Sequence, residues 1–234
     1  MVSDLGLVVF EGHNYFNSEA LPIRSNIYNF WKELWIKVNR ELGLNNEVLS
    51  DTFNRYDVII ALVEKSTKKV IGTSFHSFFD LLDVATQQMK YIKTYSPSFF
   101  DELKSKDIRS VMSTEYLAIN PEYRKGKKGI LYADIIASIV THVFQMSPAD
   151  AVICAARNDV GVSKLAKVHG YLSLLDDSDF RGYHCDQMVL YRQNISKGRP
   201  LNKEDVYKEI WANRSHYFNY VTLRDFIENP RVVA

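Results

Sequence analysis

A basic loop punctuated by glycine separates a predicted strand from the most regular helical pattern in the chain, and it limits the folds open to this sequence. The loop runs from Tyr123 to Gly129, after a strand predicted to end at Ile119 and before a helix predicted to begin at Ile130. A helix start presents unpaired N–H groups and the positive end of the helix dipole, and glycine lets an anion approach the backbone. We therefore expect the loop to bind phosphate, with charge added by Arg124, Lys125, Lys127 and Lys128.

The patterns on either side of the loop alternate between strand and helix, which indicates an α/β fold. Residues 111–119 are predicted to form a strand that Asn120-Pro121 ends, and residues 130–145 carry apolar side chains at helical spacing. Residues 151–156 are almost wholly apolar, which is typical of a strand buried in a parallel sheet. We expect a strand–helix–strand unit with a right-handed crossover.

The N-terminal part predicts a short edge strand and a long amphipathic helix. Residues 7–10 are the predicted edge strand, and residues 12–24 are a predicted loop. The helix is predicted over 25–42, with Ser25 as its N-cap and Gly43 just past its end. Its aromatic face is explained most simply as core, although beside a cleft it could line a ligand pocket.

A β-hairpin is the clearest feature of the next part. Residues 57–64 and 70–79 are apolar, β-branched runs joined by a polar turn, and Gly72 in the second run predicts a bulge or a close backbone approach. Over 81–110 the pattern is poor, except that Ser96-Pro97 predicts a helix start.

The C-terminal part predicts two more helices around a closing strand. Asn158-Asp159 is predicted to cap a short helix that ends at Gly170, and residues 183–192 are predicted to close the sheet. After a short polar linker, Asn202 is predicted to start a helix with an apolar face. Burial of large apolar side chains stabilises by about 1.5 to 3 kcal/mol each, so we expect this face to dock on the same domain. Its members are Val206, Tyr207, Ile210 and Trp211.

Composition sets limits on partners and location. The formal net charge of 234 residues is +1, whereas a nucleic-acid-binding protein is expected to be basic. No apolar run approaches the ~20 residues that would span a bilayer, and the N-terminus lacks a signal-peptide pattern, so we expect a cytoplasmic protein. Cys154 and Cys185 lie in predicted strands and are expected to be buried free thiols. Six histidines show no ligand spacing, and we expect no metal.

The segment Leu117-Ala118-Ile119-Asn120-Pro121-Glu122-Tyr123-Arg124, with the basic loop after it, resembles the acyl-CoA-binding motif of the GCN5-related N-acetyltransferase (GNAT) superfamily. Lys127 stands where the superfamily has a glycine. A second resemblance is Asn158 followed by His169-Gly170-Tyr171, in which Ala166 replaces the usual tyrosine. Together these resemblances cover roughly residues 57–192.

The resemblance implies a fold, a domain organisation and a donor. The fold would be a mixed α/β sheet of the GNAT-like acyltransferase type over residues 1–192, with a C-terminal helical extension over 193–234. The donor would be acetyl-CoA or another acyl-CoA, with no metal. The residues implied to bind it are Leu117, Ala118, Ile119, Arg124, Lys125, Gly126, Lys127, Lys128, Gly129, Ile130 and Asn158.

The same resemblance implies direct transfer of an acyl group from a thioester to an amine. The amine must lose a proton, and Glu115 is the candidate base, because strand alternation places it on one face with Ser113 and Leu117. The departing thiolate needs a proton, for which Ser163 and Tyr171 are the candidate acids.

Three functions remain open at this point. The first is an N-acetyltransferase acting on a small-molecule amine or a protein. The second is a synthase of acyl-homoserine lactones or long-chain N-acyl amino acids, with an amino acid acceptor and an acyl carrier protein as donor, since Arg55-Tyr56-Asp57 and Val70-Ile71-Gly72 resemble stretches of the lactone synthases. The third is a non-catalytic acyl-CoA-binding domain. A monomer and a homodimer both fit.

Overall fold

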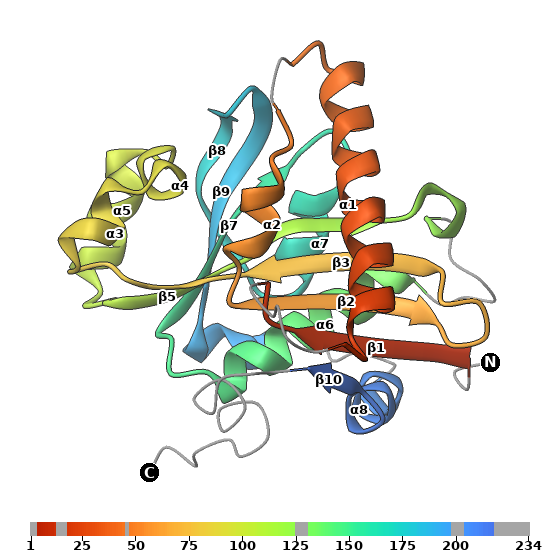
Figure 1. The fold of residues 1–234 in the computed structure, drawn as a ribbon. Coiled ribbons are helices and arrows are strands. Elements are labelled where there is room, and N and C mark those ends of the chain that lie inside the picture. The colour runs from red at the N-terminus through yellow and green to blue at the C-terminus, as the bar shows by residue number, and fades with distance from the viewer. Residues whose placement is uncertain (1–3, 13–17, 45–46, 125–130, 198–203, 218–234) are drawn as a thin grey trace. The chain divides into compact units, whose positions relative to one another are not determined.

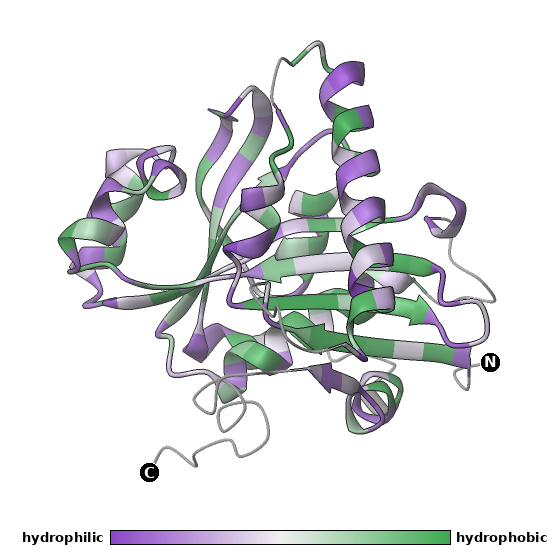
Figure 2. Ribbon diagram, viewed as in Figure 1, coloured by the Kyte–Doolittle hydropathy of each residue, from purple (hydrophilic) through white to green (hydrophobic). Residues whose placement is uncertain are grey.

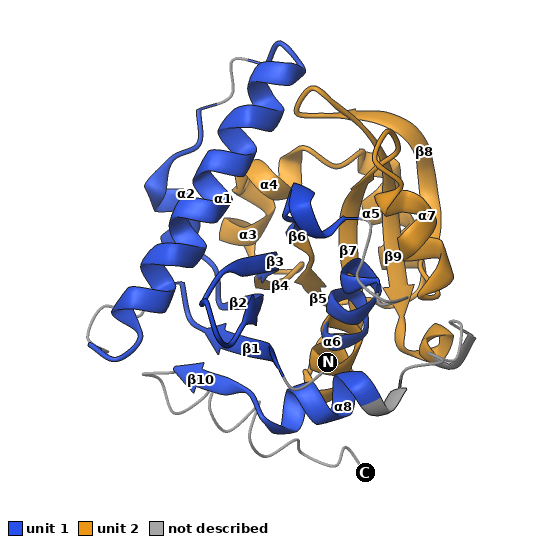
Figure 3. Ribbon diagram, turned by 90° about the vertical axis from the view of Figure 1, so that its right-hand side faces the viewer, with its two compact units in different colours: residues 1–76, 116–139, 203–234 blue, residues 77–115, 140–202 orange. Residues whose placement is uncertain are grey.

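The chain forms two units, each with a sheet of its own (Figure 3). The computed structural model describes residues 4–12, 18–44, 47–124, 131–197 and 204–217. Unit 1 comprises residues 1–76, 116–139 and 203–234, and unit 2 comprises residues 77–115 and 140–202. Strands and helices alternate in both units, so the predicted mixed α/β class is correct.

The sheet of unit 1 has the strand order β10-β1-β2-β3-β6 in the described part of the chain (Figure 1). The predicted hairpin is present as β2 and β3, which pair antiparallel. The strands are β1 (Leu5–Phe10), β2 (Val58–Glu64), β3 (Val70–His76), β6 (Glu115–Ile119) and β10 (Ser215–Tyr217). The helices are α1 (Leu21–Glu41), α2 (Ser50–Asn54), the 3₁₀ turn η2 (Pro121–Tyr123), the first half of α6 (Tyr132–Met146) and α8 (Glu204–Ala212).

Helices cover both faces of this sheet, whose strands β1 and β2 are largely hydrophobic (Figure 2). On one face, Trp31 of α1 packs on Phe75 with ring centroids 5.8 Å apart. On the other face, a Cβ atom at Gly72 would lie 2.8 Å from the side chain of Ile136 in α6 and 2.6 Å from the carbonyl oxygen of Ala118 in β6. The predicted bulge and close approach at Gly72 are both confirmed, because the register opposite it shifts between Leu62 and Val63.

Two predictions for the N-terminal part are wrong. Strand β1 is not an edge strand, because β10 pairs with it in parallel. Helix α1 starts at Leu21 and not after Ser25, since Pro22 in the first turn favours a helix start there. The end of α1 is as expected, with Gly43 at a positive φ of 66°.

The sheet of unit 2 has the order β4-β5-β7-β9-β8 in the described residues. Strands β5 and β7 are parallel, as predicted for the strands on either side of the basic loop and its helix. Cys154 and Cys185 are buried and free, as predicted. The strands are β4 (Phe78–Asp80), β5 (Ser110–Ser113), β7 (Ala151–Arg157), β8 (Leu172–Phe180) and β9 (Tyr183–Tyr191). The helices are α3 (Val84–Gln88), α4 (Lys90–Lys93), α5 (Pro97–Ser105), the end of α6, α7 (Val162–Val168) and the 3₁₀ helix η3 (Arg192–Lys197).

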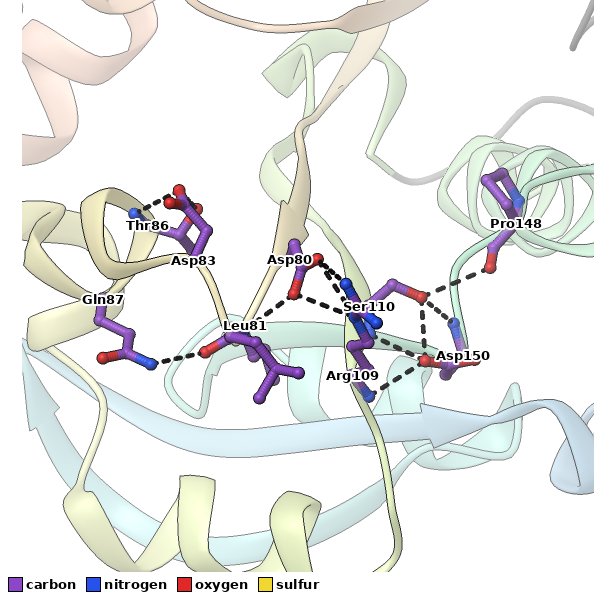
Figure 4. A network of polar contacts seen from close by, with 10 residues as sticks. Asp80, Leu81, Asp83, Thr86, Gln87, Arg109, Ser110, Pro148 and Asp150 are labelled. Atoms are coloured by element: carbon purple, nitrogen blue, oxygen red, sulfur yellow. Dashed lines mark hydrogen bonds and ion pairs between the residues drawn. The ribbon is translucent and has the colours of Figure 1, made fainter.

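Three short helices occupy the segment whose sequence pattern is poor, and they pack on one face of the unit 2 sheet. Helix α5 starts after Ser96, as predicted. A polar network holds both ends of the segment (Figure 4): Arg109 donates to Asp80 at 2.9 Å, and Asp150 accepts from the N–H groups of Arg109 and Ser110. The network joins the end of β4 to the starts of β5 and β7.

The strand predicted over 111–119 is in fact two strands in different sheets. The N–H of Thr114 still donates to Ile153 of β7 at 2.9 Å, but from Glu115 the chain runs in β6. Tyr116 takes a positive φ of 50°, and this reverses the direction of the backbone groups that a continuous strand would need. The interruption has no signal in the hydrophobic pattern.

Two helix starts and one strand also differ from the prediction. Helix α6 begins at Tyr132, while Ile130 lies outside the described residues. The N-cap of α7 is Gly161, with φ of 75°, and not Asn158, because a turn separates the two. Strand β8 was not predicted, since its acidic sequence and two register shifts hide the strand period.

The C-terminal residues described lie in unit 1. Strand β10 pairs with β1 through Val8 and Ser215, and Ile210 and Trp211 of α8 are buried. Asn202 and residues 218–234 lie outside the described residues, and the predicted limits of 1–192 and 193–234 stay a prediction.

Candidate active site

The strand predicted to hold the donor, β6, is the last strand of the unit 1 sheet. One edge of β6 faces β3, and in the described part of the chain no further strand of that sheet lies along its other edge. Leu117 and Ala118 are half-buried and Ile119 is buried. Backbone groups at such an edge can pair with an extended ligand, as in β-strand addition.

The turn after β6 is built by Asn120 and closed by Arg124. Asn120 donates from its side chain to the carbonyl of Val70 at 3.1 Å and accepts from the N–H of Glu122 at 3.2 Å. The Arg124 guanidinium donates from Nε to the carbonyl of Ile119 at 3.2 Å, so this cation lies against the end of the strand. The other loop residues predicted to bind phosphate lie outside the described residues: Lys125, Gly126, Lys127, Lys128, Gly129 and Ile130.

Aromatic rings hold the strained residue of β6 in place. The Tyr116 ring makes edge contacts with Trp31 and Trp35 at centroid distances of 5.4 and 5.0 Å, and with Phe75 at 5.6 Å. The Thr73 hydroxyl donates to the backbone carbonyl of Tyr116 at 3.3 Å. A left-handed conformation in a bulky residue costs energy and persists only where its surroundings enforce it. Trp31 is fully buried in this cluster, so the preferred explanation of the aromatic helix face as core is correct.

Glu115 is buried at the start of β6, with 9% of its surface exposed. Its Oε1 accepts a hydrogen bond of 3.1 Å from the Ser113 hydroxyl. The Ser113 hydroxyl accepts in turn from the N–H of Ser77 at 3.0 Å. The prediction that Glu115 and Ser113 share a face is therefore confirmed.

Two tyrosines missed by the sequence analysis lie close enough to Glu115 to interact with its charge. The hydroxyls of Tyr91 and Tyr95 are 2.7 Å apart in the core of unit 2. Burial raises the pKa of Tyr91 well above its ordinary value, and the neighbouring Tyr95 and Glu115 raise it further. Burial likewise raises the pKa of Tyr95. In the sequence, the spacing of four residues between Tyr91 and Tyr95 could have placed them on one face of a helix, but no helix was predicted there.

The candidate acid Ser163 is held by a buried carboxylate. Its hydroxyl donates to Asp186 at 2.5 Å, and Asp186 also accepts from Lys167 at 3.2 Å and from the N–H of Asp177 at 3.1 Å. Burial acts to raise the pKa of Asp186, but these hydrogen bonds outweigh it and lower the pKa. Asn158, predicted to bind the donor, contacts Asp177 at 3.4 Å.

The other candidate acid, Tyr171, is buried, and this raises the pKa of its hydroxyl; Cys154 adds to the rise and a contact with the Thr114 hydroxyl opposes it. Thr114 stands between Ser113 and Glu115, so neighbouring residues of the chain carry the contact to Tyr171 and the hydrogen bond to Glu115.

No group of three His, Cys, Asp or Glu residues positioned for a metal ion occurs among the described residues. Within the same ranges, no helix has the length and apolar character needed to cross a membrane.

No protein-family model and no curated protein matches the chain. Solved structures do match. A mosquito arylalkylamine N-acetyltransferase like 5b is 14% identical, with a TM-score of 0.54 and coverage of 80% of this chain and 99% of that one. The N-acyl amino acid synthase FeeM from uncultured soil microbes is 9% identical, with a TM-score of 0.54 and coverage of 85% and 97%. The CoA-dependent acyl-homoserine lactone synthase BjaI is 10% identical, with a TM-score of 0.54 and coverage of 97% and 99%.

At these identities the matches show the fold. The chain has the GNAT-like acyltransferase fold that the motif around Leu117 and Arg124 implied.

Proposed function

We propose that the protein is an N-acyltransferase that moves an acetyl group from acetyl-CoA to the amine of a small molecule or amino acid in the cytoplasm. The observation that carries the proposal is the content of strand β6. Glu115 begins the strand, Leu117–Ile119 present its outer edge, and Arg124 closes the turn at its end. Glu115 and Ile119 are the first and last of the five residues of this strand. The base and the donor-binding backbone are thus parts of one short strand.

The chemistry follows from this arrangement. The donor arm pairs with the edge of β6, and an N–H group there stabilises the negative charge that develops on the thioester carbonyl oxygen. Glu115 accepts a proton from the ammonium group, and the neutral amine attacks the carbonyl carbon. The C–N bond forms, the C–S bond breaks, the attacking nitrogen gives up its second proton to solvent, and the thiolate of CoA leaves and takes up a proton. Ser163 already donates its proton to Asp186, which leaves Tyr171 as the candidate acid.

A second function is supported by the extent of one structural match. The likeness to the CoA-dependent acyl-homoserine lactone synthase runs over 97% of this chain and so includes the N-terminal helix and the C-terminal residues. In that case the donor would carry a longer acyl group, on CoA or on an acyl carrier protein, and the acceptor would be an amino acid derivative.

Binding and turnover of three donors test both functions. Native mass spectrometry of the purified chain with acetyl-CoA, a long-chain acyl-CoA and an acylated carrier protein identifies the donor. Release of free thiol in the presence of a panel of amines and amino acids then measures transfer.

Glu115→Gln tests the base in the same assay. It should lower turnover by about 10²- to 10⁴-fold while donor binding is retained, and the loss should shrink at high pH, where the amine is already neutral. Glu122→Gln is the control, because Glu122 is an exposed carboxylate paired with Lys69 at 2.6 Å. Full activity of Glu115→Gln would refute the role of Glu115, and no binding of any donor would refute the function.

A further inference from the structure

We propose that Ser113 is a positioning residue for Glu115: its hydroxyl, locked by the backbone of Ser77, holds one oxygen of the catalytic carboxylate in place. This inference rests on the proposed function. Ser113 is fully buried at the end of β5, and Glu115 follows two residues later at the start of β6.

Ser77 fixes Ser113 at two points. The N–H of Ser113 donates to the carbonyl of Ser77 at 2.8 Å, and the N–H of Ser77 donates to the hydroxyl oxygen of Ser113 at 3.0 Å. A serine hydroxyl has one hydrogen to give and two lone pairs. Because one lone pair receives the amide of Ser77, the hydroxyl hydrogen points away from that amide. The Glu115 oxygen at 3.1 Å lies where this hydrogen can reach it.

The bend between β5 and β6 makes this hydrogen bond matter. Glu115 stands at the point where the chain leaves one sheet and enters the other, next to the strained Tyr116. A glutamate has three side-chain torsions, and a base is effective only when its oxygen is held close to the proton it accepts. The Ser113 hydroxyl supplies one fixed point for a side chain that the interrupted strand does not align.

The surroundings of Glu115 in unit 2 make its charge state readable. The titratable and charged groups near Glu115 in unit 2 include Tyr91 and Tyr95 from the α4 segment, Cys154 from β7 and Arg181 from the turn between β8 and β9. Burial raises the pKa of Tyr91, Tyr95 and Cys154, so these three stay neutral at ordinary pH. A titration that the glutamate signal shows at lower pH therefore does not come from these three groups.

The test compares Ser113→Ala with the wild type by pH–rate profile and by carbon-13 NMR of labelled glutamate side chains, with Glu115→Gln identifying the Glu115 signal. A hydrogen bond to the charged form favours that form, so its loss should move both the acidic limb of the profile and the Glu115 titration to higher pH, by about 0.5 to 1 unit. Turnover should fall about tenfold at neutral pH, with the KM for the donor unchanged. Ser113→Thr keeps the hydroxyl and should restore both readouts.

Ser147→Ala is the matched control, because Ser147 is another buried serine of unit 2 whose hydroxyl donates to a backbone carbonyl, that of Phe144, at 2.9 Å. It should leave both readouts unchanged. Wild-type titration and an unshifted acidic limb in a folded Ser113→Ala variant overturn the inference. If the wild type transfers no acyl group from any donor, the proposed function fails, and with it the catalytic part of the inference; the NMR titration then still decides whether Ser113 holds Glu115.

Discussion

Gly72 offers a direct test of how closely β6, the strand that we propose binds the donor, is packed. A methyl group at this position of β3 would lie 2.6 Å from both the carbonyl oxygen of Ala118 and the Cδ1 of Ile119, and 2.8 Å from the Cδ1 of Ile136. Ordinary contacts between such atoms are about 3.5 Å, so the neighbours must move by almost 1 Å. A side chain can rotate away, but the Ala118 oxygen can move only with the backbone of β6.

We expect Gly72→Ala to lower the free energy of unfolding by about 1 to 2.5 kcal/mol. Overpacking against a backbone atom, which cannot rotate away, falls in the upper part of the usual range at about 2 to 3 kcal/mol, and the smaller entropy of the unfolded alanine chain returns about 0.4 to 1 kcal/mol. Urea denaturation followed by circular dichroism measures the change, and calorimetry should show weaker acyl-CoA binding if the edge that contains Ala118 binds the donor as we propose.

A second glycine of the same sheet provides the control. A Cβ at Gly6 of β1 would lie 3.1 Å from side-chain atoms of Lys65 and Val63, and its nearest backbone neighbour, the carbonyl oxygen of Val63, would be at an ordinary contact distance of 3.7 Å. The side-chain atoms can shift by a few tenths of an ångström, so Gly6→Ala should cost less than about 1 kcal/mol. If Gly72→Ala is as stable as the wild type, β3, β6 and α6 are not packed as closely as described.

Two further predictions concern polar anchors of unit 2. Burial acts to raise the pKa of the Asp150 carboxyl, but hydrogen bonds from Ser110 and Arg109 outweigh it and lower the pKa below 3.8. The charged carboxylate therefore stabilises the fold fully well above pH 3.8. This stabilisation is lost as the pH falls through the lower pKa that Asp150 has in the folded protein. Asp150→Asn should therefore cost about 1 to 2 kcal/mol at pH 7 and almost nothing near pH 2, as thermal melts across this range would show; an equal loss at both pH values would contradict it. Arg192→Ala should lower the free energy of unfolding by about 1 to 3 kcal/mol in urea denaturation. Arg192→Lys should recover only part of this loss, because one ammonium cannot replace a guanidinium that lies 4.7 Å from the Phe144 ring. Full recovery of stability by lysine would contradict this. The guanidinium bonds the carbonyls of Gln145, Ser147 and Ala149.

The elements that the sequence predicts best are those whose side chains repeat with one period. The hairpin of β2 and β3, helix α6 and strand β7 each have a continuous apolar pattern, and all three are present. The order of strand, basic loop and helix was also enough to predict the fold, because the resemblance to the superfamily depends on that order and on few identical residues. The shared face of Ser113 and Glu115 followed from the period of two in a strand.

The features that were missed depend on contacts between distant parts of the chain. Strand β8 carries three aspartates and two register shifts, and it is a strand because β9 pairs with it. Tyr91 lies in a helix of four residues, too short for periodicity to predict, and Tyr95 follows the end of that helix. The parallel pairing of β10 with β1 joins residues about two hundred positions apart, and local preference carries no information on it.

The interruption between β5 and β6 connects the fold to the proposed chemistry. A continuous strand from Val111 to Ile119 would stay in one sheet, and its edges would be paired alike along its length. Up to Thr114 the chain pairs with β7, and from Glu115 onward it forms the last strand of the other sheet. The break therefore gives β6 an outer edge, at which we propose the donor binds.

The energetic cost of this break falls on Tyr116, whose positive φ is unfavourable for a residue with a Cβ. A glycine would relieve that strain, but it would also free the backbone to take other conformations. The tyrosine ring contacts Trp35 and Phe75 at centroid distances of 5.0 and 5.6 Å, so the cluster around α1 holds Tyr116 in one conformation. Within unit 1, the packing of the aromatic face of α1 therefore fixes the strand that we propose binds the donor.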